Sequence, residues 1–208
     1  MHSPLGVGKS SSVRPRVMLG SELQGQVVDF HPTANPPGGR AFTLSGRIIA
    51  DFVWSREERA VRIEALDDVW WGRFSAGHIF GGVIEAVGGA PQMLYGGGLV
   101  TGVALARSGA KYELFVASDW RHGAWAGIDD AEGMAVLRAR RHFGRYGSMS
   151  EVELSPEARH CRDLWPLLLL WGSLSIVKER RPFRGMLSLR TSRRAAEQAL
   201  SHVLDALM

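Results

Sequence analysis

The sequence contains only one cysteine, Cys161, so it cannot form an intramolecular disulfide. A lone cysteine fits a reducing compartment. The chain also lacks a Cys-X-X-Cys pair, and no two of its seven histidines are four residues apart. These absences leave a zinc site without support, and we expect no metal and no cofactor. The first twenty residues lack the apolar stretch of a secretory signal peptide, so we expect a cytoplasmic location.

An apolar run of sufficient length to cross a bilayer comfortably is also missing. The run from Leu164 to Val177 has 14 residues. As a helix it would span roughly 21 Å, whereas a bilayer core of about 30 Å needs about 20 apolar residues. Asp163 can cap this helix, and Pro166 is tolerated in the first turn. Length favours a buried helix over a membrane anchor inserted through residues 164–177, although Trp165 and Trp171 favour the anchor, because tryptophan prefers membrane interfaces.

Residues 40 to about 154 consist of short runs in which apolar and polar residues alternate. In the run at 60–65, Val61, Ile63 and Ala65 alternate with Arg62 and Glu64. The same alternation recurs at 111–116 and 151–154, and it is typical of half-buried strands. Turn residues separate the runs, among them the glycines at 88–89 and 96–98. About ten such strands without helices between them predict an antiparallel barrel or sandwich.

The strands and the apolar helix have complementary requirements. A helix that is apolar on every face must be surrounded on every face, and a barrel wider than about eight strands is not filled by its own side chains. Gly172, Ser173 and Ser175 provide slim positions where the helix can approach strands closely. We therefore predict a mainly β fold, an antiparallel barrel of about 10–12 strands around a central hydrophobic helix at 164–181.

Two segments lie outside the predicted barrel, which covers residues 40–184. Residues 1–39 are rich in proline and glycine, and we expect a disordered or loosely attached tail, in which the apolar patch at 27–30 either adds one strand or docks on the domain. Residues 185–208 predict an accessory amphipathic helix. Its apolar stripe consists of Ala196, Leu200, Val203 and Leu207.

The pattern of short alternating strands with glycine-rich or aspartate-rich tips, followed by a hydrophobic helix that ends in basic residues, resembles the tubby-like superfamily. That group includes phospholipid-scramblase-like and LURP-one-related proteins. The resemblance covers about Arg40 to Arg184 and is one of pattern, because no specific motif of these families matches. It implies a strand barrel around a central helix and contact with lipid head groups through basic surface. It implies no enzyme chemistry and assigns no residue.

Positive charge is concentrated in the last third of the chain. Residues 1–137 carry 12 Lys/Arg and 14 Asp/Glu, whereas residues 138–208 carry 13 and 7. Seven cations lie within 17 residues that contain one acid: Lys178, Arg180, Arg181, Arg184, Arg190, Arg193 and Arg194. This basic segment, residues 178–194, predicts contact with anionic phospholipid at about 1 kcal/mol per cation. Two other interpretations remain, a solubilising cap at the end of a helix and the arginine bias of a GC-rich genome.

Catalytic and nucleic-acid functions find little support. The strand region is net acidic, so we expect no nucleic-acid partner. His160 and Cys161 are adjacent, and such neighbours rarely face each other, which favours a structural, half-buried cysteine over a thiolate nucleophile. Asp119 and His122 form only a weak acid–base pair on a predicted loop.

We therefore predict a non-enzymatic binding or scaffold module, cytoplasmic or peripheral at the membrane, with no identifiable protein partner. The alternatives are a small membrane protein anchored by residues 164–177 and, with least support, an enzyme that uses His160 and Cys161.

Overall fold

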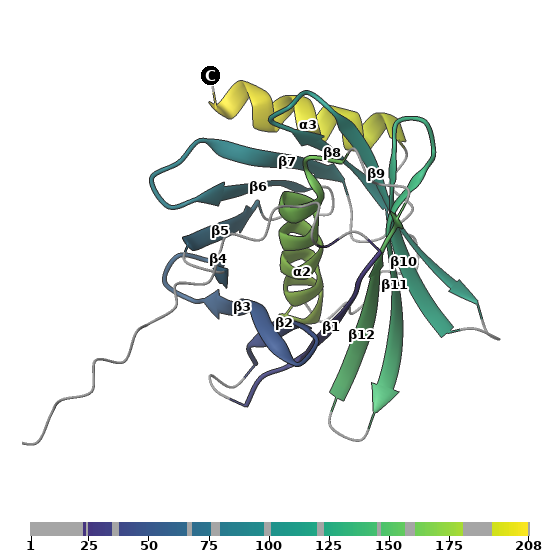
Figure 1. Ribbon diagram of the computed structural model, residues 1–208. Helices are drawn as coiled ribbons and strands as arrows, with labels where there is room; N and C mark the ends of the chain where they lie inside the picture. Colours follow the sequence, from purple (N-terminus) through teal and green to yellow (C-terminus); the bar gives the residue numbers. More distant parts are fainter. Residues whose placement is uncertain are drawn as a thin grey trace, which may run out of the picture.

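Twelve antiparallel strands form one closed barrel in the computed structural model, and two helices follow them (Figure 1). The structure describes residues 23, 25–34, 38–65, 68–75, 80–97, 101–119, 123–144, 147–156, 161–180 and 193–207. The strands are β1 Val27–Pro32, β2 Arg40–Leu44, β3 Arg47–Ser55, β4 Ala60–Ala65, β5 Asp68–Phe74, β6 Phe80–Ala86, β7 Pro91–Gly97, β8 Thr101–Ala106, β9 Lys111–Asp119, β10 Gly123–Asp130, β11 Ala135–Gly144 and β12 Gly147–Leu154. The helices are α2 Leu164–Arg180 and α3 Arg193–Leu207. The predicted mainly β barrel is confirmed.

Each strand pairs with its neighbour in the sequence, and β1 closes the ring between β2 and β12. This strand lies within the segment expected to form a tail. Of the two alternatives for the patch at 27–30, the structure shows the added strand, so the barrel begins at residue 27 rather than at Arg40. The reason is that Val28 and Phe30 are buried inside, and that pairing on both sides removes the open edges of β2 and β12.

The alternation of the strands separates the barrel interior from its outer surface. In β4, Val61, Ile63 and Ala65 are buried, whereas Arg62 and Glu64 are exposed, as predicted. The same holds in β12, where the side chains at 152 and 154 are buried and those at 151 and 153 are exposed. A slip of one residue would turn each buried set outward, so the apolar pattern determines the register.

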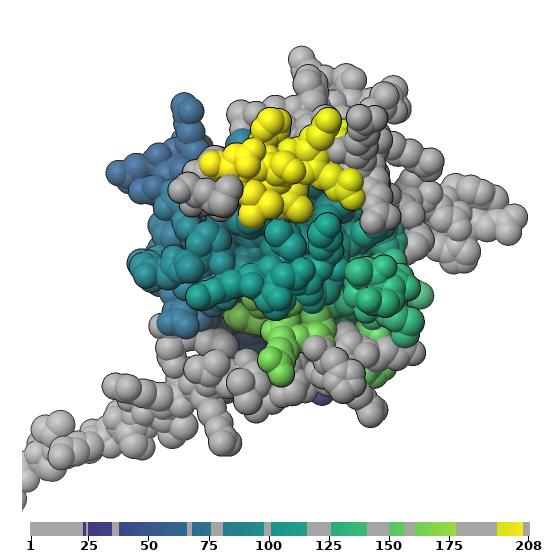
Figure 2. All heavy atoms as spheres, turned by 90° about the horizontal axis from the view of Figure 1, so that it is seen from above, coloured from purple at the N-terminus to yellow at the C-terminus, as the bar shows by residue number. Residues whose placement is uncertain are grey.

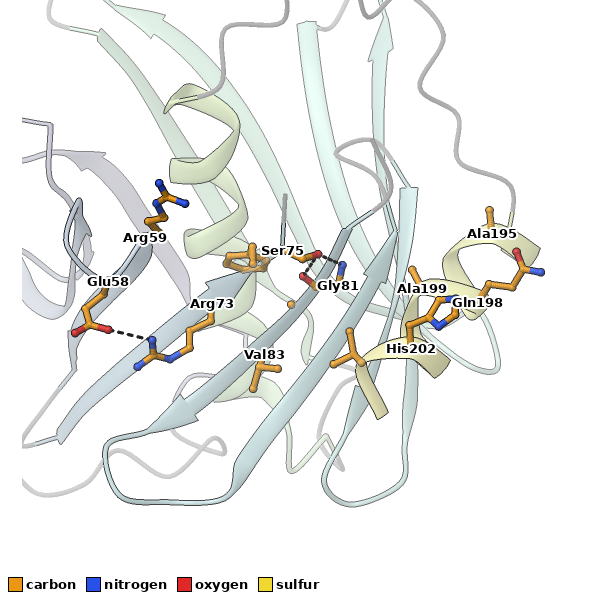
Figure 3. Close-up of a pocket in the computed structure, with 13 residues that line it drawn as sticks. Glu58, Arg59, Arg73, Ser75, Gly81, Val83, Ala195, Gln198, Ala199 and His202 are labelled. Atoms are coloured by element: carbon orange, nitrogen blue, oxygen red, sulfur yellow. Dashed lines mark hydrogen bonds and ion pairs between the residues drawn. The ribbon is translucent and has the colours of Figure 1, made fainter. Parts of the chain in front are cut away.

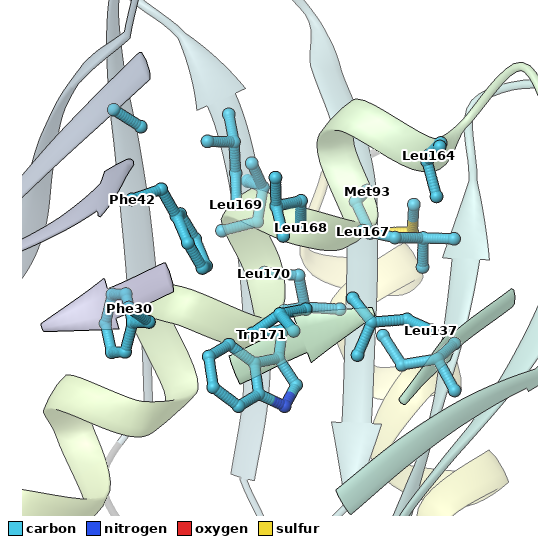
Figure 4. Packing of buried hydrophobic residues seen from close by; sticks show 14 of the residues in the cluster. Phe30, Phe42, Met93, Leu137, Leu164, Leu167, Leu168, Leu169, Leu170 and Trp171 are labelled. Carbon is cyan, nitrogen blue, oxygen red and sulfur yellow. The ribbon is translucent and has the colours of Figure 1, made fainter. Parts of the chain in front are cut away.

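The central helix of the prediction is also confirmed, because α2 runs through the barrel (Figure 1). Figure 4 shows its leucines between Phe30 and Phe42 on one wall and Met93 and Leu137 on the other. The ring centroid of Trp171 lies 5.3 Å from that of Phe30 and 6.0 Å from that of Phe42. In the part of the chain that the structure describes, no helix has the length and apolarity needed to span a membrane.

The slim positions of α2 meet the barrel wall closely, as expected. A Cβ at Gly172 would lie 2.7 Å from Cζ of Phe52, so a larger residue would collide with the ring. On the neighbouring side, a Cβ at Gly72 of β5 would lie 2.7 Å from Oγ of Ser173. The hydroxyl of Ser175 instead donates to the carbonyl one turn earlier in α2, at 3.0 Å. Gly172 and Ser173 thus bring the helix and the strands close together.

The second helix, α3, covers the outer face of β6, β7 and β8 (Figures 1 and 2). Ala196 and Leu200 of the predicted stripe are buried against Leu94 and Val103, and the side chain of the stripe's last residue, 207, lies outside the described part. A Cβ at Gly96 would lie 2.4 Å from the backbone of α3. The glycines at 96 and 97, predicted to form a turn, belong to β7 and pair with β8. Gly96 allows the close approach of α3, and Gly97 that of β8, where a Cβ would lie 2.5 Å from Cα of Gly102.

Candidate functional site

The predicted basic segment begins in α2 and ends in α3. Lys178 and Arg180 lie in the last turn of α2, and Arg193 and Arg194 lie in the first turn of α3. The other three cations, at 181, 184 and 190, lie outside the described residues, as do the side chains of all seven. The two helices therefore attach both ends of the segment to the barrel.

The direction of α2 determines at which rim of the barrel the basic segment starts. Before its first turn, the carboxylate of Asp163 accepts a hydrogen bond of 2.7 Å from Ser108 in the β8–β9 turn. Further along, α2 contacts Phe52 and Gly72, which lie in the second halves of β3 and β5. Because β3 and β5 run away from the rim of the β8–β9 turn, α2 ends toward the opposite rim. The β3–β4 turn, residues 56–59, lies at that rim.

The β3–β4 turn presents two arginines and two glutamates to solvent. The N–H of Glu58 donates to Oγ of Ser55 at 3.2 Å, which stabilises the turn. Arg59 has a φ of +52°, in the left-handed region where an arginine is rare. This backbone conformation separates the two neighbouring side chains, and Figure 3 shows Glu58 directed toward Arg73 and Arg59 directed away from it.

A cleft of about 730 Å³ lies between this turn, the β5–β6 pair and α3 (Figure 3). Two consecutive glycines of β6 shape it. A Cβ at Gly81 would lie 2.0 Å from Cγ2 of Val203, so this glycine allows α3 to approach β6. A Cβ at Gly82 would lie 2.3 Å from Cδ1 of Phe74, so this glycine makes room for the ring. On the side of α3, Val83 and Val203 give the cleft an apolar surface, whereas Phe74 packs against the barrel core.

The two arginines of the cleft differ in whether they pair with a carboxylate. Arg73 donates from Nε to Glu85 at 3.0 Å and from Nη1 to Glu58 at 3.2 Å, and it lies 5.2 Å from the ring of Trp71. The hydrogen bond to Glu85 is the main cause that raises the pKa of Arg73. Among the described residues, Arg59 makes no ion pair, so it is the cation available to a ligand in this cleft.

A second polar cluster surrounds the start of α2. The carboxylate of Asp163 accepts hydrogen bonds from Ser108 and, at 2.9 Å, from the hydroxyl of Tyr112. Its carbonyl accepts the N–H of Leu167 at 3.0 Å, as expected of the residue that caps the helix. A capping carboxylate often accepts the N–H of the third helical residue, but that residue is Pro166 here, which has no N–H to donate. The carboxylate is therefore available to hold the β8–β9 turn and β9 against the helix.

Cys161 belongs to the same cluster, with its sulfur 3.4 Å from the hydroxyl of Tyr112. Burial raises the pKa of the Cys161 thiol, and burial likewise raises the pKa of the Tyr112 phenol. A nucleophilic cysteine needs a lowered pKa, so the environment favours the predicted half-buried structural thiol. Its predicted neighbour His160 lies outside the described residues.

The remaining sequence candidates add no chemistry to these places. Asp119 is the last residue of β9, and the structure describes its backbone but not its side chain. His122 lies outside the described residues. Among the residues that the structure describes, no three histidine, cysteine, aspartate or glutamate side chains gather where they could hold a metal ion. The cleft was not predicted from the sequence, in which the Gly81-Gly82 doublet within a strand is the available signal of a close approach.

Comparisons with protein-family models, with curated proteins and with solved structures found no match to this chain.

Proposed function

We propose that this protein is a non-enzymatic binding or scaffold module of the tubby-like type, which contacts anionic phospholipid through the basic segment, residues 178–194. The closed barrel around an apolar helix supports the tubby-like assignment, since that arrangement is what the resemblance implies. The proposed location is the cytoplasm, peripheral at the membrane. The proposal includes no cofactor and no nucleic acid, and it names no protein partner.

The observation that carries this proposal is the course of α2. The helix buries its apolar residues within the barrel and leads Lys178 and Arg180 to the rim of the β3–β4 turn, where Arg56 and Arg59 are exposed. Cations near an anionic membrane surface each contribute about 1 kcal/mol, and this attraction falls off within roughly 8 Å at physiological salt. Seven cations with one acid among them therefore favour reversible binding that salt weakens.

Vesicle co-sedimentation tests the proposal. The protein should pellet with vesicles that contain phosphatidylserine and remain in solution with vesicles of phosphatidylcholine alone, and about 0.5 M salt should release it, because the Debye length shrinks. Each cation removed from the basic segment should weaken binding to these vesicles about fivefold. Equal binding to both vesicle types would refute the lipid contact. The fourfold variant changes Lys178→Gln, Arg180→Gln, Arg181→Gln and Arg184→Gln.

A matched control removes four exposed cations at the opposite rim, and it should bind as the wild type does. This control changes Arg47→Gln, Arg107→Gln, Lys111→Gln and Arg162→Gln. If both fourfold variants lose binding equally, the attraction depends on total charge and not on the basic segment.

Fractionation distinguishes this proposal from the alternative of a membrane protein anchored by residues 164–177. Peripheral contact predicts that a high-salt wash releases the protein from the membrane pellet. Release only by detergent would favour the anchor and would require the barrel to open, because the same residues fill its interior.

A further inference from the structure

The cleft between α3 and the β5–β6 pair offers a ligand few groups for hydrogen bonding in its middle. Ser75 accepts the N–H of Gly81 at 2.9 Å and donates to the carbonyl of Gly81 at 3.3 Å, so its hydroxyl is already engaged. Val83 of β6 provides apolar surface beside it on the side of α3, and Ala199 and Val203 add further apolar groups from the helix, whereas the neighbouring Phe74 packs against the barrel core.

The polar groups of the cleft lie toward its two ends. Figure 3 shows Glu58 and Arg59 on the side of the β3–β4 turn, and Gln198 and His202 on the side of α3, with Val83 between them. The volume of about 730 Å³ falls within the range of about 300–1,000 Å³ that is usual for sites of small organic ligands.

The charges identify which end takes an anion. Arg73 is held by Glu58 and Glu85, so an anion placed there would also meet two carboxylates. Arg59 lies beside it in a left-handed conformation and, within the described part of the chain, has no carboxylate bound to it. A guanidinium that binds a carboxylate makes hydrogen bonds about twice as strong as those between neutral groups. Arg59 is therefore the anion-binding end.

We propose that this cleft binds one amphiphilic carboxylate of the fatty-acid type. The carboxylate pairs with Arg59, and the acyl chain lies over Val83 toward Ala199 and Val203. A peptide does not suit this surface, because its N–H and C=O groups would be buried without partners, which costs free energy. An acyl chain has no such groups and gains from covering apolar surface. The described lining of this cleft includes none of the seven cations of the basic segment, although Arg59 lies at the rim where that segment begins.

Binding of a fluorescent fatty acid, cis-parinaric acid, below its micellar concentration tests this site with the full chain. We expect saturable binding of one molecule, with clearly weaker binding of the methyl ester, which lacks the carboxylate charge. Arg59→Asn removes the charge and keeps a residue that tolerates a positive φ, and it should weaken binding about tenfold. Arg56→Asn, in the same turn but not lining the cleft, should leave affinity unchanged.

A second pair of variants tests the chain-binding part. Gln198→Trp places a large side chain in the cleft from an exposed position of α3 and should abolish binding, whereas Ser201→Trp, exposed on the same helix but not lining the cleft, should have no effect. Absence of saturable binding, or binding that neither Arg59→Asn nor Gln198→Trp weakens, would overturn the proposal. Vesicle binding is measured separately, so failure here leaves the phospholipid proposal standing, and the reverse also holds.

Discussion

Ser173 is the position where the packing of α2 inside the barrel can be tested most directly. Its side chain is 0% exposed, and its hydroxyl has no hydrogen-bond partner. On the facing strand, β5, Gly72 leaves the space that this hydroxyl occupies. Ser173→Ala removes a polar atom that the fold buries without compensation, so we expect the variant to be more stable than the wild type.

The expected gain has two parts. A buried polar group without a partner costs about 1–3 kcal/mol, which alanine avoids. Alanine is also a better helix former than serine by about 0.5 kcal/mol. The loss of one oxygen's contacts with β5 offsets a fraction of this gain. We therefore expect Ser173→Ala to raise the free energy of unfolding by about 1–2 kcal/mol.

A companion substitution on the strand makes the test specific for the contact. The Cβ of Gly72→Ala would lie 2.7 Å from Oγ and 2.9 Å from Cβ of Ser173. Overpacking of this kind costs about 1–3 kcal/mol. In the Ser173→Ala background the closer contact is gone, so the cost of Gly72→Ala should fall by at least about 0.5 kcal/mol, which is a measurable coupling energy.

Urea unfolding followed by circular dichroism measures all four proteins, and equal m-values would make the midpoints comparable. Ser201→Ala on the exposed face of α3 is the control, because it reports helix propensity without burial. A loss of more than about 1 kcal/mol in Ser173→Ala would show that the hydroxyl has a partner in the folded protein. A coupling energy of zero would refute the contact between α2 and β5 in this register.

Three further predictions concern other parts of the fold. Ser45 and Gly46 form the β2–β3 turn with φ of +51° and +76°, so Ser45→Asn should raise the urea midpoint by the equivalent of about 0.5 kcal/mol, and a lowered midpoint would contradict this turn geometry. Burial raises the pKa of Cys161 and Tyr112, so the stability that their neutral forms contribute is complete below their unfolded pKa values and is lost as pH rises. The free energy of unfolding should therefore fall above about pH 8.5, and less so in Cys161→Ala. Gly96→Ala would bring a Cβ within 2.4 Å of the backbone of α3, so limited proteolysis should cleave α3 faster than in the wild type, and an unchanged rate would contradict this docking.

Part of the proposed function could be predicted from local patterns, and part could not. The basic segment is visible in the sequence as seven cations in 17 residues. The cleft is not, because it depends on the β3–β4 turn, the β5–β6 pair and α3, which meet only in the folded chain. The proposed role of Arg59 likewise requires its backbone conformation and the pairing of Arg73 with Glu58 of the β3–β4 turn and Glu85 of β6.

The sequence by itself determined the strands, the barrel and the central helix, because alternation of period two and an apolar run are local properties that lead to burial on one face or on all faces. Only the tertiary structure decided that β1 closes the ring and that Gly96 belongs to a strand. It also decided that the carboxylate of Asp163 accepts hydrogen bonds from Ser108 and Tyr112. Each of these depends on contacts between residues far apart in the chain, and no local pattern encodes which distant backbone or side chain will arrive at a given position.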